Sequence, residues 1–123
     1  MKNKSFYILF LILISFIMTG CATTERMYYW GDYSNTLYTC RKDVNDENLL
    51  KHQQTLENII EESNKRNLRV PPGVYAELGY IYFRQNNNNV AIKYFDLEAR
   101  TYPESQVFMK RLTQAATAKT TPK

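Results

Sequence analysis

The N-terminal segment decides how much of this chain can fold into a domain. Thirteen residues, 6–18, are apolar except for Ser15, and Lys2 and Lys4 precede them. A positive start, an apolar core and small residues behind it are typical of a secretory signal peptide. A membrane-spanning helix needs about 20 apolar residues, so this shorter run predicts a signal cleaved after residue 20. Removal of 20 of the 123 residues leaves 103 for the mature chain.

The end of this signal carries a more specific motif. Met18-Thr19-Gly20-Cys21 resembles the lipobox of bacterial lipoproteins, with Met18 in place of the usual Leu. The resemblance implies that the Cys21 thiol receives fatty acyl chains such as palmitate, which anchor a protein by about 0.8 kcal/mol per buried CH₂. Ala22 follows Cys21, and the sorting rule of enteric bacteria then implies the outer membrane. The alternative is an uncleaved anchor with an incidental cysteine.

Composition and charge narrow the function classes. Hydrophobic residues are 44% and charged residues 23% of the chain, which excludes collagen, disulfide-dense toxins and wholly disordered chains. The net charge of +4 falls to +2 when Lys2 and Lys4 leave with the signal, and no basic patch carries the aromatic pattern of nucleic-acid binding. Once Cys21 is acylated, Cys40 has no internal partner. It is either a buried small hydrophobe or half of an intermolecular disulfide.

Apolar residues recur at helical spacing through the rest of the chain, and no alternating strand pattern of useful length occurs. The fold class is therefore all-α. The expected helices cover residues 33–42, 46–66, 72–85, 89–101 and 104–116, the last with Val107, Phe108 and Leu112 on one face. The expected division of the chain is a lipoprotein signal peptide at 1–20, a lipidated tether at 21–27, a helical domain at 28–116 and a flexible tail at 117–123.

Residues 72–105 place large, small and aromatic side chains at fixed offsets across two helices. Helix–turn–helix arrays repeat at about 34 residues with such offsets, and this segment resembles a tetratricopeptide repeat. Glu98 and Asn88 depart from the usual small residue and tyrosine. The alternative is a generic helical hairpin that matches by chance. The matching positions are Tyr75, Leu78, Gly79, Tyr82, Ala91, Phe95 and Pro103.

One such repeat cannot bury its apolar face alone. Residues 33–66 have the size of a degenerate preceding helix pair, and residues 104–116 would be a capping helix. The expected architecture is therefore a minimal α-solenoid of tetratricopeptide-like helical hairpins.

A wider resemblance covers nearly all of the mature chain. Its segments are YWGDY at 29–33, LY at 37–38, VPPGVYAELGY at 70–80 and YPES at 102–105. Together they resemble a family of small uncharacterised bacterial lipoproteins, often encoded beside a lipoprotein similar to the curli secretion channel and a second small lipoprotein. The resemblance implies a role in an outer-membrane lipoprotein assembly and supplies no biochemical activity.

Little in the chain suits catalysis. His52, the single histidine, lies at helical spacing from Leu56 and Ile59, which favours a packed helix residue over a ligand. Cys40 and His52 lack the further ligands of a zinc site, and no phosphate loop or Gly-x-Ser-x-Gly motif is present. We expect no enzyme, no metal site and no cofactor besides the covalent lipid on Cys21. A Cys40–His52 nucleophile pair is the alternative.

Two surfaces are candidates for recognition. In tetratricopeptide arrays the first helix of each pair lines a concave groove, and that resemblance places Ala76, Tyr80, Phe83 and Arg84 there. Two aromatic rings beside an arginine suit a peptide that carries a carboxylate. The alternative is that the C-terminal helix folds over these residues and makes them core.

The other candidate is the aromatic cluster of Tyr28, Tyr29, Trp30 and Tyr33, just after the tether. Tyr and Trp are enriched at binding hot spots and at membrane interfaces. The cluster therefore has three interpretations: it docks a partner protein, it contacts lipid headgroups, or it fastens the tether to the first helices.

These features favour a non-enzymatic outer-membrane lipoprotein that faces the periplasm and acts as a tetratricopeptide-like adaptor or scaffold. The expected partner is the curli-channel-like lipoprotein, and no nucleic acid is expected. One alternative is a regulator of a peptidoglycan synthase, which the six-residue tether disfavours because its coil reaches about 13 Å. Another is a small-ligand-binding helical lipoprotein. The oligomeric state stays open.

Overall fold

The computed structural model describes residues 3–4, 7–8 and 26–120. Cys21 and most of the expected signal peptide and tether therefore lie outside the described residues. Residues 26–120 contain five α-helices, one short 3-10 helix and no strand, so the expected all-α class is confirmed. The elements are α2 (Tyr33–Lys42), α3 (Asp46–Lys65), α4 (Val74–Arg84), α5 (Asn88–Thr101), η1 (Pro103–Ser105) and α6 (Gln106–Thr120).

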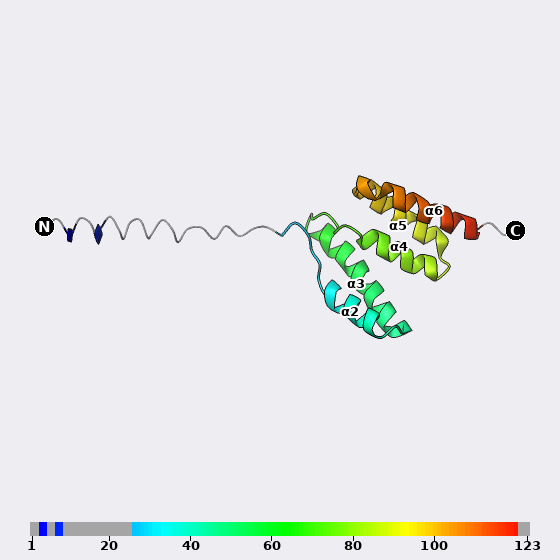
Figure 1. Cartoon of the computed structure of the whole chain (residues 1–123), viewed down its shortest axis with the longest axis horizontal. Helices are drawn as coiled ribbons and strands as arrows, with labels where there is room; N and C mark the ends of the chain where they lie inside the picture. The colour runs from blue at the N-terminus through cyan, green and yellow to red at the C-terminus, as the bar shows by residue number, and fades with distance from the viewer. Residues whose placement is uncertain (1–2, 5–6, 9–25, 121–123) are drawn as a thin grey trace.

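Each helix packs against the next one along the chain, which gives a row of helical hairpins (Figure 1). Helix α4 lies between the α2–α3 pair and the α5–α6 pair, so it contributes to both halves of the core. None of the helices in the described part of the chain combines the length and apolar composition needed to cross a membrane.

Local sequence explains the ends of α3. The Asn45 side chain accepts a hydrogen bond from the Asn48 backbone N–H at 2.8 Å, which caps the helix. Asp46 and Glu47 in the first turn interact favourably with the helix dipole. After the last turn, Asn67 takes a left-handed φ of 54°, which reverses the chain. The expected boundaries of this helix are confirmed to within one residue.

Helix α4 begins at Val74, two residues later than the start expected at Pro72. The cause is Gly73, whose φ of 88° lies in the left-handed region and cannot belong to a right-handed helix. Gly73 is instead the N-cap, and it has no side chain with which to cap the helix.

The core consists of two clusters that share α4. The first lies between α3 and α4, and the second joins α5 and α6 to the other side of α4. The first cluster contains Leu56, Ile59, Val70, Val74, Leu78 and Ile81. The second contains Ala91, Phe95 and Met109.

Gly79 permits the close approach of α4 and α5. A Cβ added there would lie 2.8 Å from Phe95 Cε1, closer than real contacts allow, and a tight 3.1 Å from Tyr94 Cβ. Phe95 and Ala91 are fully buried beneath it. Tyr75 and Tyr82, which were expected as repeat positions, are half-buried and stack on Tyr94 instead of filling the centre of the core.

Helix α6 departs from expectation in its inward face and its length. Val107 is 70% exposed and Phe108 60% exposed, so these two residues do not share the packed face with Leu112. Met109 and Ala116 are buried and Leu112 packs with them, at spacings of three and four residues. The η1 turn directly precedes this helix. The helix also continues to Thr120, beyond the end expected at residue 116.

Candidate functional site

A buried polar network joins the first three helices. His52 on α3 is 2% exposed. Its Nδ1 lies 2.9 Å from Thr36 Oγ1 on α2, and its Nε2 lies 3.1 Å from Glu77 Oε1 on α4. Tyr33 donates a hydrogen bond from its hydroxyl to Glu77 Oε2 at 2.8 Å. His52 is thus a packed helix residue, as expected, and its hydrogen bonds connect α3 to α2 and α4.

The network keeps Glu77 ionised. Burial alone raises the pKa of this carboxyl, but the hydrogen bonds from His52 and Tyr33 outweigh it and hold the pKa below its usual range. Burial and the bond to Glu77 raise the pKa of Tyr33 to about 12. The Thr36 hydroxyl is buried and also within 3.2 Å of the backbone carbonyls of Asp32 and Tyr33. The Thr36 hydroxyl therefore connects α2 to α3 through His52.

Cys40 and His52 lie on different helices, and the hydrogen bonds of His52 go to Thr36 and Glu77. Cys40 is partly buried and is not in a disulfide within the described residues. In the same part of the chain, no three His, Cys, Asp or Glu side chains gather where a metal ion could be held.

Glu98 explains how α4 is capped without a side chain on Gly73. The Glu98 carboxylate on α5 is buried, and its Oε1 accepts a hydrogen bond from the Gly73 backbone N–H at 2.8 Å. The backbone N–H groups of Tyr75 and Ala76 also stabilise its charge. Burial nevertheless raises the pKa of Glu98. The residue that departs from the repeat pattern thus serves as a cap supplied from the neighbouring helix.

A groove of about 480 Å³ runs between α4 and α6. Its α4 wall is formed by Gly73, Ala76, Glu77 and Tyr80, and its α6 wall by Phe108 and Leu112. Tyr80 is 47% exposed, and Phe108 also presents most of its surface to solvent. The lining is mainly apolar, and Glu77, the single ionisable carboxylate in it, already accepts hydrogen bonds from His52 and Tyr33.

The structure brings together half of the expected groove residues. Ala76 and Tyr80 line the groove. Phe83 packs against the second core cluster, with Lys119 Nζ 4.8 Å from its ring centre. Arg84 is exposed at the end of α4 and does not line the groove. Helix α6 forms the opposite wall of the groove and does not bury Tyr80.

The aromatic segment after the tether packs onto its own domain. Tyr29 and Tyr33 contact the first core cluster. Tyr28 is hydrogen-bonded to Tyr102, whose hydroxyl donates to the Val70 carbonyl. Burial, followed by the Tyr28 bond, raises the pKa of Tyr102. These contacts favour the interpretation in which the segment fastens the tether to the helices.

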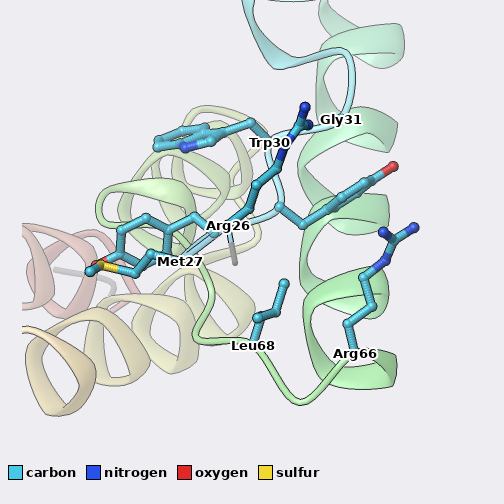
Figure 2. Close-up of a pocket in the computed structure, with 8 residues that line it drawn as sticks. Arg26, Met27, Trp30, Gly31, Arg66 and Leu68 are labelled. Atoms are coloured by element: carbon cyan, nitrogen blue, oxygen red, sulfur yellow. The ribbon is translucent and has the colours of Figure 1, made fainter. Parts of the chain in front are cut away.

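Trp30 differs from the tyrosines around it because it is 41% exposed. Its ring lies 5.1 Å from that of Tyr33, measured between centroids. It lines an open cavity of about 700 Å³ where residues 26–31 cross the C-terminal end of α3 (Figure 2). Arg66 and Leu68 complete the wall, and the Arg66 guanidinium lies 4.4 Å from the centre of the Tyr29 ring.

One signal in the sequence could have identified a further groove residue. Met109, Leu112 and Ala116 have helical spacing, which would have turned Phe108 outward toward the groove. The carboxylates of Glu77 and Glu98 carry no local signal, because their partners are 25 to 44 residues away.

Comparison with known proteins gives a family and no activity. Neither the curated proteins nor the solved structures contain a match to this chain. A family model described as a domain of unknown function, DUF4810, matches residues 27–112. The match starts at the aromatic segment, includes all of α2 to α5 and ends within α6. The chain therefore belongs to the DUF4810 family.

Proposed function

We propose that this protein is a non-enzymatic adaptor, held on the outer membrane by a lipid on Cys21, that binds a segment of a partner protein in the groove between α4 and α6. The observation that carries the proposal is the exposure of Tyr80 and Phe108 across a groove of about 480 Å³. Large aromatic side chains in concave apolar sites are typical binding hot spots.

The tetratricopeptide-like reading supports the same surface. In such arrays the first helix of each pair lines the concave side, and α4 has this position in the hairpin of α4 and α5. Gly79, Ala91 and Phe95 occupy the close contact that the repeat pattern requires. The partner segment therefore presents apolar side chains to Tyr80, Phe108 and Leu112, and Arg84, which lies outside the groove, makes no contact with it.

The lipid anchor fits an adaptor because it confines the domain to one surface. Anchoring raises the effective concentration of a partner bound to the same membrane. The gene neighbourhood of the resembling lipoproteins makes the curli-channel-like lipoprotein the first partner to test, in a complex that faces the periplasm.

The test is site-specific photo-crosslinking with the lipidated full chain in bacterial membranes. A photoreactive phenylalanine analogue replaces Phe108 in one variant and Tyr38 in another. Tyr38 is a matched control because it is an exposed aromatic residue on α2, outside the groove. We expect one dominant crosslinked protein from position 108, absent at position 38, and lost when Tyr80→Ala is added.

Thermal melting of each variant shows that the fold is intact. Equal crosslinking at both positions, or no protein adduct at position 108 in a folded, membrane-bound protein, would overturn the adaptor. If the crosslinked protein is a peptidoglycan synthase, the groove is still the binding site, but the partner is the synthase and not the curli-channel-like lipoprotein. A small-molecule adduct at position 108 would instead support the ligand-binding alternative.

A further inference from the structure

The cavity at the end of α3 combines arginine and apolar side chains, and the groove between α4 and α6 contains no arginine. Arg26, Met27 and Trp30 lie on one side of it, and Arg66 and Leu68 on the other (Figure 2). Two guanidinium groups therefore stand beside an apolar surface. Met27 and Trp30 present large apolar areas to solvent. Exposed apolar patches of this kind often mark an interaction site.

Both guanidinium groups have N–H donors that can bind an anion. Arg26 is exposed and is not in an ion pair within residues 26–120. Arg66 donates to Glu62 from Nη2 at 3.0 Å and from Nε at 3.3 Å and lies over Tyr29, yet its side chain is half exposed. A guanidinium has five N–H donors, so the Glu62 contact leaves donors of Arg66 free to bind phosphate oxygens.

We propose that this cavity binds the phosphodiester headgroup of a phospholipid in the membrane that carries the anchor. Arg26 and Arg66 donate N–H groups to the phosphate oxygens, as arginine does at other phosphate sites. Met27 and Trp30 contact the glycerol and the first methylenes of the acyl chains. Tryptophan is enriched at this depth because its ring is largely apolar and its N–H remains near water.

The length of chain between the anchor and the cavity favours lipid over a protein partner. This inference rests on the acylation of Cys21 in the proposed function. Five residue steps separate Cys21 from Arg26, and a fully extended chain spans at most about 18 Å over that number. A folded domain of 100 residues has a radius of gyration of about 13 Å. The gap therefore has no room for another domain between this face and the membrane.

Trp30 gives a direct readout because it is the single tryptophan of the chain. The lipidated full-length protein is reconstituted into vesicles of phosphatidylethanolamine and phosphatidylglycerol. Matched samples use vesicles of a glycolipid without phosphate, and maltoside micelles with and without inorganic phosphate. We expect the emission of Trp30 to shift to shorter wavelength and to be quenched by brominated acyl chains in the phospholipid vesicles. We expect smaller changes in the glycolipid and none on addition of phosphate to micelles.

Substitutions distinguish the effect of these two guanidinium groups from the effect of general surface charge. Arg26→Ala reduces the shift and the quenching, and Arg26→Lys restores part of them. Arg66→Ala gives a second loss at an independent position. Arg111→Ala is the control, because Arg111 is exposed on α6 outside the cavity. Circular dichroism of each variant reports the helical fold.

Vesicle flotation reports the acyl anchor separately from Trp30. Flotation with a phosphate-dependent Trp30 response supports both proposals. Flotation with the same Trp30 emission in phospholipid and glycolipid overturns the headgroup site and leaves the anchor. If the protein does not float with the vesicles and Trp30 still responds to phospholipid, the result supports the headgroup site and contradicts the anchor. An equal response to inorganic phosphate in micelles would overturn the lipid as the ligand.

Discussion

At the scale of single residues, two positions decide how α4 sits against its neighbours. Gly79 removes the side chain that would otherwise separate α4 from α5. Glu98 brings a carboxylate to the first turn of α4, where Gly73 has no side chain to offer. Gly79 acts by being small and Glu98 by accepting a backbone hydrogen bond, and both stabilise the hairpin of α4 and α5.

Gly79→Ala should destabilise the domain. Alanine is favoured over glycine in a helix by about 1 kcal/mol, but its Cβ would lie 2.8 Å from the ring of the fully buried Phe95. Overpacking of a core costs about 1–3 kcal/mol, so we expect a net loss of about 1 kcal/mol in the free energy of unfolding, measured with urea. Phe95→Leu in the same background should cost less than in the wild type. Additive effects of the two changes would contradict this explanation.

At the scale of elements, the polar network connects three helices through one carboxylate. Glu77 on α4 bonds to Tyr33 on α2 and to His52 on α3. Its pKa is lowered in the folded state from the usual 4.5. A depressed folded pKa means that the ionised form stabilises the fold above the unfolded pKa, and that this stabilisation is lost as the pH falls through the folded pKa.

Glu77→Gln should therefore be destabilising at neutral pH and less so in acid. Hydrogen bonds to a charged group contribute about 1.5–3 kcal/mol, and glutamine keeps the shape without the charge. We expect a loss of about 1–3 kcal/mol at pH 7 that shrinks as the pH falls below 4.5, from urea unfolding across a pH series. Glu61→Gln is the control, because this exposed carboxylate pairs with Lys65 at the surface. A loss of the same size at every pH would refute the electrostatic argument.

The helices follow from local rules, and the relations between them do not. The Asn45 cap and the Asn67 reversal predict the ends of α3 because both act within a few residues. The inward face of α6 was predicted wrongly because Val107 and Phe108 are as apolar as Met109, and tertiary packing selects among them. Phe108 forms part of the α6 wall of the groove, and only the spacing of Met109, Leu112 and Ala116 would have turned it outward. The Glu77 bonds were not predictable either, since they join distant segments.

At the scale of the whole molecule, the chain is a short row in which each helix contacts its immediate neighbours. Helix α4 belongs to both core clusters, while α6 packs on α5 and reaches α4 across the groove. The Tyr28–Tyr102–Val70 contacts tie the N-terminal segment to the end of α5. The helices inside the row are therefore stabilised by neighbours on both sides, and α6 is stabilised mainly by α5 on one side.

This asymmetry predicts that α6 opens before the rest of the domain. Met109→Ala removes a buried side chain from its contact with α5, and such truncations cost about 2–5 kcal/mol. In a row of nearest-neighbour contacts the loss acts first on the terminal element. We expect amide hydrogen exchange to speed up most in α6, less in α5 and least in α3.

The matched control is Ile59→Ala, a comparable truncation in the first core cluster. It should accelerate exchange in α2 and α3 at least as much as in α6, because its cavity lies in the first core cluster, which contains no α6 residue. If Met109→Ala accelerates exchange equally in α3 and α6, the domain unfolds as one unit. The groove would then be rigid on both walls. If α6 alone opens, the Phe108 wall moves relative to Tyr80, and a partner segment that fills the groove should restore the protection of α6.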